Sequence, residues 1–348
     1  MHKTKSPTAT IRCGVVGVGR MGRHHARLCS QMDGADLVGV ADESDARRAE
    51  MVELYGCGSY ASVDALIAAG VDACVIATPT VTHRAIVEKL LAAGVHCLVE
   101  KPLAPDEVQA HAMVEAAKRG TAILQVGHVV RFDPVMVAIR GIADLRPRFI
   151  EVDRVSPMTF RSVDVGVVLD MMIHDLDVLI MLMGCEPDEI HANAVSVLGE
   201  AEDVCNARLV FPAGPDGIRC TANVTASRLA LKTERKIRII SEDTYVSADF
   251  GERRGTVVRK AVNAAQLAEI RERFKRGEDL SGLNYLELVK VDALDVGKGE
   301  PLKLQLESFF DSIRTGGHPF VDAQAGFAAV RTAQRIVEAA RKAGSRMV

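Results

Sequence analysis

The chain has 348 residues, more than one ordinary core holds, and its length predicts two domains. Its 43 Lys and Arg residues against 46 Asp and Glu give a formal net charge of -3, and no basic run favours nucleic acid as a partner. Hydrophobic residues reach 48%, but no uninterrupted apolar span approaches the roughly 18 residues of a membrane helix, and the opening "MHKTKSPTAT" lacks the apolar segment of a signal peptide. We therefore expect a cytoplasmic protein with no membrane or nucleic-acid partner.

Apolar runs of strand length alternate with helical periods between residues 11 and 130. The expected strands are "IRCGVVG", "ADLVGVAD", "DACVIAT", "VHCLVE" and "TAILQVG", and the expected helices span 20–31, 46–54, 83–93 and 105–118. This alternation predicts an α/β Rossmann domain, a doubly wound parallel sheet with helices on both faces. Residues 1–10 are expected to form a disordered lead-in.

After residue 130 the pattern changes to longer strands with alternating polarity. These are "FIEVDRV", "EIHANAVSV", "NARLVF", "IRCTANVTA", "RKIRII" and "TYVSADF", with one helix inserted between the first two. A charged section from 252 to 300 is expected to be irregular, and helices over 302–315 and 323–343 are expected to close the chain. Residues 131–348 thus predict a second, largely antiparallel α+β domain.

Eight cysteines are spread along the chain without a C-x-x-C pair. Several lie in apolar runs, as in "DACVIAT" and "HCLVE". This usage is typical of small buried side chains in a reducing compartment, and it predicts neither a metal site nor a thiol nucleophile.

The segment "GVGRMGRHHA" follows the first strand and opens the first helix. Gly17, Gly19 and Gly22 have the G-x-G-x-x-G spacing, with Arg20 and Met21 inside the turn. The first glycine permits a tight turn, the second lets a pyrophosphate approach the backbone, and the third lets the helix pack closely. A dinucleotide-binding turn is therefore expected here.

Asp42 ends the second strand, twenty residues after Gly22. A carboxylate at this place binds the adenosine ribose hydroxyls and repels a 2′-phosphate, so NAD is expected rather than NADP. Arg47 and Arg48 begin the next helix and argue the other way, because either one could reach a phosphate.

Two further segments end at the carboxyl edge of the expected sheet, where doubly wound folds bind ligands. "VEKPLAP" brings Glu100 and Lys101 to this edge, and the following proline fixes the backbone beside them. "ATPTVTH" brings Thr78, Pro79 and His83 to the same edge. We expect these residues to line the cofactor, although His83 is equally compatible with a helix start that has no such role.

The largely apolar segment "GVVLDMMIHDLDVLIMLMG" contains one histidine and three aspartates. At 100° per residue, Asp170, His174 and Asp177 lie on one stripe of a helix, while Asp175 points elsewhere and is expected to cap or pair structurally. The stripe is either the solvated face of an amphipathic helix or an Asp/His pair that lines a pocket.

These motifs together resemble the Gfo/Idh/MocA family of oxidoreductases. The resemblance rests on "GVGRMGRHHA", "ATPTVTH", "EKPLA", "VGHVVRFDP" and "VLDMMIHDLD" in this order, and it extends to "LQLESFFDSIRTGGHPFVD" near the end. It implies NAD as the cofactor, with Lys101, Asp170 and His174 around the reacting carbon. It also implies that the sheet of residues 131–348 is open, mixed and mainly antiparallel, and that this domain serves substrate binding and oligomerisation in a homodimer or homotetramer. Oxidation of a secondary alcohol needs a base and a cation for the developing alkoxide, and either Lys101 or His174 could take the proton.

Around "DRVSPMTFRSVDVGVVLD" the chain resembles family members that oxidise the 3-hydroxyl of UDP-N-acetylglucosamine. That resemblance implies a substrate side formed by His128, Arg131, Arg154 and Arg161. The guanidinium groups of the three arginines could hold a diphosphate or a carboxylate. The alternatives are an inositol or other polyol dehydrogenase, a reductase of an imine or cyclic dione, and a non-catalytic NAD-binding regulatory protein.

Overall fold

The computed structural model describes residues 10–159, 165–198 and 200–345. The chain divides into two compact units built from interleaved segments. The first unit comprises the residues up to Phe132 with Val168–Met181 and Gly299–Glu338, and the second comprises Asp133–Val167, Leu182–Lys298 and the residues from Ala339. Within the described ranges, no helix is both long and apolar enough to span a membrane.

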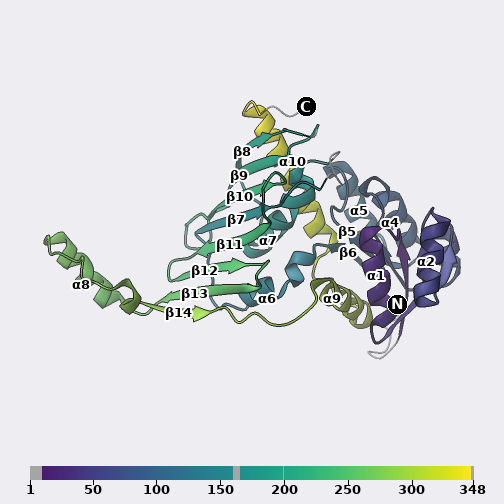
Figure 1. Cartoon of the computed structure of the whole chain (residues 1–348), viewed down its shortest axis with the longest axis horizontal. Helices are drawn as coiled ribbons and strands as arrows, with labels where there is room; N and C mark the ends of the chain where they lie inside the picture. The colour runs from purple at the N-terminus through teal and green to yellow at the C-terminus, as the bar shows by residue number, and fades with distance from the viewer. Residues whose placement is uncertain (1–9, 160–164, 199, 346–348) are drawn as a thin grey trace. The chain divides into compact units, whose positions relative to one another are not determined.

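The first unit holds a parallel sheet of six strands in the order β3-β2-β1-β4-β5-β6 (Figure 1). Its strands are β1 (Ile11–Val16), β2 (Ala35–Ala41), β3 (Gly58–Tyr60), β4 (Ala73–Ile76), β5 (His96–Glu100) and β6 (Leu124–Gly127). This is the doubly wound order, in which the direction of winding reverses between β1 and β4. The predicted Rossmann domain is confirmed, although β3 was missed because three residues carry no periodicity.

Helices α1 (Arg20–Gln31), α2 (Asp45–Tyr55), α3 (Val63–Ala68), α4 (His83–Ala92) and α5 (Glu107–Lys118) connect these strands. Two closing helices, α9 (Pro301–Thr315) and α10 (Ala323–Lys342), add apolar side chains to the same core. Phe309 and Phe310 of α9 belong to a buried cluster with Cys13 and Val15 of β1, and Phe327 of α10 belongs to a second cluster with α4 and α5. The unit is therefore completed by residues from the far end of the chain.

The second unit holds an eight-stranded sheet in the order β14-β13-β12-β11-β7-β10-β9-β8 (Figure 1). Its strands are β7 (Phe149–Val155), β8 (Glu189–Val195), β9 (Val204–Val210), β10 (Thr221–Ser227), β11 (Glu234–Ile240), β12 (Thr244–Asp249), β13 (Arg254–Lys260) and β14 (Val289–Ala293). Only β7 and β10 pair in parallel; the other neighbours are antiparallel. Burial alternates along β7, β9 and β10, so one face is covered and the other is open, as the sequence predicted.

The expectation of an irregular section over 252–300 was wrong. This section contains β13, α8 (Ala264–Lys275) and β14, and Figure 1 shows α8 on an extension that leads away from the sheet. A capping box between Asn263 and Gln266 starts α8, but its described side chains are exposed or half-buried. Leu267, Ile270 and Phe274 of α8 have helical spacing but none of them is buried, so the sequence analysis overlooked a short apolar stripe in a charged segment. The short helix α6 (Pro134–Arg140) was missed for its length.

The single regular helix expected over the Asp170 segment was also wrong. The segment begins with a π-helical turn, Val168–Met172, and continues as α7 (Ile173–Met183). A π-helical turn advances by fewer degrees per residue than the 100° of an α-helix, so angular positions calculated at 100° per residue do not apply to Asp170.

Candidate active site

The glycine turn after β1 has the geometry that its spacing predicts. Gly17 has a φ of +81°, and a Cβ there would meet the Ala77 backbone at 2.9 Å. A Cβ on Gly22 would lie 1.8 Å from the carbonyl oxygen of Gly17, whereas one on Gly19 would meet nothing within 4 Å. The first and third glycines are thus required by packing, and the second leaves open space at the amino end of α1.

No side chain caps the amino end of α1, which begins at Arg20 with Gly19 as its N-cap. Its first N–H groups are therefore available to an anion such as a pyrophosphate, and the helix dipole favours negative charge at the same place. Arg20 is exposed and Met21 half-buried in this first turn.

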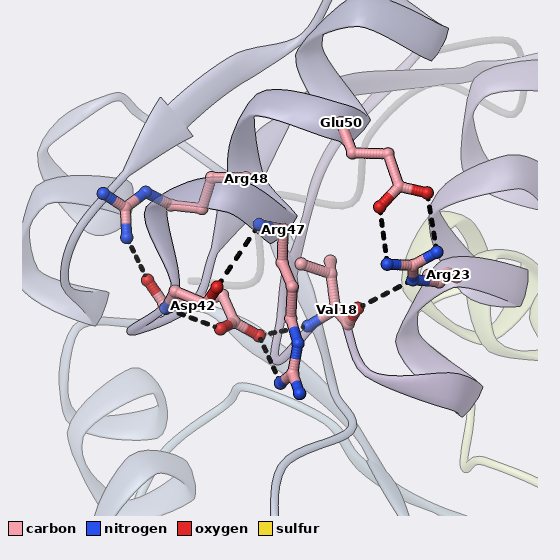
Figure 2. Close-up of polar contacts among 7 residues, drawn as sticks. Val18, Arg23, Asp42, Arg47, Arg48 and Glu50 are labelled. Carbon is pink, nitrogen blue, oxygen red and sulfur yellow. Dashed lines mark hydrogen bonds and ion pairs between the residues drawn. The ribbon is translucent and has the colours of Figure 1, made fainter.

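Asp42 follows β2 and is held by the backbone on both sides (Figure 2). Its Oδ2 accepts the N–H of Val18 at 2.8 Å, and its Oδ1 accepts the N–H of Ser44 at 2.9 Å. Each carboxylate oxygen can accept two hydrogen bonds, so one site on each remains for ribose hydroxyls. The contact with Val18 places this carboxylate beside the glycine turn.

The two arginines after Asp42 have different surroundings (Figure 2). Arg48 is largely buried; its guanidinium donates to the carbonyl oxygen of Asp42, to Asp45 and, at 3.2 Å, to Ser59 Oγ. Arg47 is 54% exposed, and its Nη1 lies 3.9 Å from Asp42 Oδ2. Arg48 is therefore committed to protein partners, and Arg47 is the one placed to act on a bound cofactor.

Figure 2 also shows the contact that anchors α2 to α1. Arg23 donates from its two terminal nitrogens to Glu50, at 2.6 and 2.5 Å, and from Nε to the Val18 carbonyl oxygen at 3.4 Å. A bidentate pair of this kind fixes orientation as well as distance. The helix that carries Arg47 is thus held in place beside the glycine turn.

His83 joins the loops that follow β4 and β5. It is buried, with Nδ1 3.1 Å from the Pro102 carbonyl oxygen and Nε2 3.0 Å from the Thr78 carbonyl oxygen. Burial lowers the pKa of His83 and outweighs the carbonyl contacts that raise it. This placement supports a role in holding the loops of Thr78 and Pro79 rather than a direct contact with the cofactor.

Lys101 and Asp170 are brought together from positions 69 residues apart. Nζ of Lys101 donates to the carbonyl oxygen of Asp170 at 2.7 Å and to its Oδ1 at 3.1 Å. The side chains of Lys101 and Asp170 remain 19% and 37% exposed, so the pair is still accessible. An ammonium group positioned at the carboxyl end of β5 can stabilise a developing alkoxide.

His174 is the second residue of α7 and is half-buried. The described partner of the Asp170 carboxylate is Lys101, so the orientation of His174 by Asp170 stays a prediction.

Asp177 pairs with an arginine in the interior of the first unit. Its carboxylate is fully buried and accepts hydrogen bonds from Nε and Nη2 of Arg131 at 2.7 and 2.6 Å. Arg131 also donates to the Phe320 carbonyl oxygen at 3.3 Å, which favours a structural role for it over a diphosphate contact.

His128 directly follows β6 and lies at the carboxyl edge of the parallel sheet, as Lys101 does. Glu100 pairs with Gly127 in the β5–β6 register, so the next residues, Lys101 and His128, leave neighbouring strands side by side. His128 is fully buried, and neither ring nitrogen has a hydrogen-bond partner among the described residues. Burial lowers its pKa, so the ring is neutral. Buried imidazoles are normally bonded, and a bound ligand would supply the missing partner.

The remaining predicted arginines belong to the second unit or to no described segment. Arg154 lies on β7 and is 6% exposed, and Arg161 lies outside the described residues.

A cavity of about 770 Å³ lies at the other edge of the parallel sheet. Its lining includes Asp72 and His96, at the amino ends of β4 and β5, and the loop from Gly316 to Pro319. Ligands of doubly wound sheets bind at the carboxyl edge, so this cavity is separate from the site of Lys101.

Within the described ranges, the cysteine and acidic side chains form neither a disulfide nor a cluster that could hold a metal ion. All the cysteines are free and seven are buried, and burial raises the pKa of Cys74 to about 12. In the part of the chain that the structure describes, no three His, Cys, Asp or Glu side chains are grouped to hold a metal ion.

Sequence reasoning missed the buried pair formed by His25 and Glu100, whose Nε2 and Oε1 lie 2.7 Å apart. A signal for His25 was present, because Gly22, His25, Ala26 and Cys29 occupy one buried face of α1 at helical spacing. The partner could not be read from the sequence, since it lies 75 residues away.

Comparison with known proteins bears on both units. Residues 11–128 match the model of an oxidoreductase family with an NAD-binding Rossmann fold, and residues 146–246 match a Gfo/Idh/MocA C-terminal domain. The chain is 34% identical over 316 residues to UDP-N-acetylglucosamine 3-dehydrogenase from Acidithiobacillus ferrooxidans, covering 91% of this chain and 93% of that protein. A solved structure of that dehydrogenase superposes with a TM-score of 0.85 at 32% identity, over 97% of this chain and 99% of the other.

The chain is also 30% identical over 313 residues to myo-inositol 2-dehydrogenase from Thermotoga maritima, covering 84% of this chain and 90% of that protein. Similarity of this extent covers the glycine turn, the Lys101 loop and the sheet of the second unit together. The chain belongs to the Gfo/Idh/MocA family and is an NAD-binding oxidoreductase.

Proposed function

We propose that this enzyme oxidises the 3-hydroxyl group of UDP-N-acetylglucosamine. The observation that carries the proposal is the 34% identity, over 91% of the chain, to a dehydrogenase of that name. The motifs that would do the chemistry are all present: the glycine turn, Asp42, Lys101, Asp170 and His174.

Three side chains share the proton chemistry in this proposal. NAD, when bound, accepts the hydride that leaves C3 of the sugar. His174 takes the proton of the 3-hydroxyl as general base, which leaves a ketone. Lys101 donates a hydrogen bond to the oxygen while it carries negative charge, and Asp170 holds the ammonium group in place through the 3.1 Å contact.

On the substrate side, His128 is proposed to contact the sugar or the nicotinamide, since both of its buried ring nitrogens lack described partners. Because Arg131 is bound to Asp177, Arg154 and Arg161 are the proposed contacts of the diphosphate.

We also propose a homodimer or homotetramer that works in the cytoplasm. The open face of the second sheet supports association, and eight free cysteines suit a reducing compartment. Light scattering on the purified protein gives the subunit number, and a monomer at micromolar concentration would contradict this part of the proposal.

The substrate is tested by comparing four compounds under one set of conditions. NADH formation is followed at 340 nm with UDP-N-acetylglucosamine, free N-acetylglucosamine, myo-inositol and glucose. We expect rapid oxidation of the nucleotide sugar, and kcat/KM about a hundredfold lower for the free amino sugar, because remote phosphate contacts supply binding energy that positions the reacting carbon. Oxidation of myo-inositol alone would replace this proposal by a second candidate, a polyol dehydrogenase, which the Thermotoga maritima relative favours.

Cofactor preference gives a separate prediction. We expect NAD to bind at least about tenfold more tightly than NADP, a difference of about 1.4 kcal/mol, because a 2′-phosphate would lie beside the Asp42 carboxylate. Titration of both cofactors measures it. Arg47→Ala should widen the preference by removing the positive charge 3.9 Å from Asp42. Equal affinities in the unmodified enzyme would mean that Arg47 overrides Asp42.

A further inference from the structure

A buried histidine links the phosphate-binding helix to the strand end that carries Lys101. His25 is fully buried on α1, three residues after Gly22, and its Nε2 lies 2.7 Å from Oε1 of Glu100. Glu100 is the last residue of β5, and its Oε2 accepts the backbone N–H of Lys101 at 3.3 Å. The two carboxylate oxygens thus connect α1 to the backbone of Lys101.

The pair has a defined charge. Burial raises the pKa of Glu100, but the His25 hydrogen bond and the charges of His25 and Lys101 more than reverse this effect, so the pKa lies below its ordinary value. Glu100 is therefore a carboxylate, and Nε2 of His25 is the donor. Nδ1 of His25 is buried without a hydrogen-bond partner among the described residues, so the contact that the ring makes is the one to Glu100.

Neighbouring elements do not replace His25. Within the described residues, His83 from α4, His128 after β6 and Asp170 from the π turn also act on Glu100 or Lys101. Burial lowers the pKa of both His83 and His128, so neither ring brings positive charge. Asp170 contacts the ammonium group of Lys101 and not Glu100. His25 is thus the side chain that supports the buried carboxylate from outside the Lys101 loop.

We propose that His25 is a positioning residue of the reaction, which holds Glu100 as a carboxylate so that Glu100 fixes Lys101 for alkoxide stabilisation. The same contact joins the helix that receives the pyrophosphate to the residue that acts on the substrate. The negative charge of Glu100 balances the positive charge of the Lys101 ammonium group, and the hydrogen bond from His25 keeps Glu100 ionised. The kinetic part of this inference rests on the proposed function.

The first test replaces His25 by leucine, which fills the space without a donor. Without the hydrogen bond and charge of His25, burial raises the pKa of Glu100 against the smaller opposing effect of Lys101, so Glu100 takes up a proton more readily as the pH falls. We expect kcat to fall by about tenfold or more, with a loss that grows as the pH falls, while the NAD Kd stays within about threefold. His25→Gln should restore most of the rate, because the glutamine Nε2 lies the same number of bonds from the backbone. His24→Gln, at the exposed neighbouring position, is the matched control and should change nothing.

Four results would overturn the inference. An equal loss at every pH, or no rescue by His25→Gln, would reduce His25 to a packing role. The double variant His25→Leu with Glu100→Gln has no carboxylate at position 100 to protonate. It should therefore lack the pH dependence of kcat that His25→Leu introduces, and a pH dependence that remains would belong to another group. If His25→Leu does not fold, the comparison of Glu100→Gln with His25→Gln tests the inference. Glu100→Gln should lower kcat and His25→Gln should keep it, and an unchanged kcat in Glu100→Gln would refute the positioning role of His25.

A readout without substrate separates this inference from the proposed function. If the unmodified enzyme oxidises none of the four compounds, the proposed function fails. Acetylation of Lys101 by acetic anhydride, measured by mass spectrometry against exposed Lys118, then tests the inference. Lys101 should react several-fold faster relative to Lys118 in His25→Leu, because less negative charge holds its ammonium form, and an unchanged ratio would overturn the inference.

Discussion

Replacing Lys101 by methionine is expected to lower kcat by about a hundredfold or more and to leave the NAD Kd within a few fold. Methionine keeps the length and most of the volume of the side chain but removes the ammonium group that Asp170 holds at 3.1 Å. His174→Gln should have an effect of similar size, because it removes the proposed base. Steady-state kinetics at several pH values and a fluorescence titration of NAD measure both quantities.

Lys118→Met is the matched control, since that side chain is 65% exposed and should leave kcat unchanged. Loss of NAD binding in parallel with kcat would mean that Lys101 supports the cofactor site and not the chemistry. Retention of full activity in both Lys101→Met and His174→Gln would refute the roles proposed for Lys101 and His174, whereas an unmodified chain that binds NAD but oxidises no substrate would support the regulatory alternative.

Breaking the buried pair of Arg131 and Asp177 should have the largest effect on stability. Asp177→Ala leaves a buried guanidinium with no counter-charge, and we expect the free energy of unfolding to fall by about 3–5 kcal/mol. The double variant Arg131→Met with Asp177→Leu should recover most of this loss, because well-packed apolar residues replace a buried ion pair at little cost. Urea unfolding followed by circular dichroism provides the measurement.

An exposed pair serves as the comparison. Arg84 and Glu88 of α4 are 42% and 33% exposed, and Glu88→Ala should cost about 0.5 kcal/mol or less. If Asp177→Ala costs no more than Glu88→Ala, then Arg131 is free to find another partner. That result would return Arg131 to the set of proposed diphosphate contacts.

The sequence predicted most of the first unit because its strands are short apolar runs separated by regular helices, and because the glycine spacing has one structural interpretation. It failed where periodicity is absent, short or broken. β3 has three residues, α8 has only a short apolar stripe that is not buried, and the π turn changes the angular spacing that the Asp170 stripe assumed. Each failure therefore has a local physical cause.

For the candidate site, the position of Lys101 at the end of a strand indicated a role for it, and the polar stripe with the family resemblance indicated one for the Asp170 segment. Neither predicted which groups would meet. Asp170 binds Lys101 across 69 residues, and Arg131 binds Asp177 across 46. Such partners depend on the packing of whole elements. The sequence identified the charged groups, whereas their pairing required the three-dimensional structure.

The interleaving of the two units has a consequence for synthesis on the ribosome. The apolar cluster of β1 includes Phe309 and Phe310 of α9, and about 170 residues separate the end of β6 from the start of α9. At about 5–20 residues per second, roughly ten to thirty seconds pass between the synthesis of β6 and the synthesis of α9. During that interval Cys13, Val15 and their neighbours lack the apolar contacts that Phe309 and Phe310 provide. Maturation of the NAD-binding half is thus a late event, tied to completion of nearly the whole polypeptide.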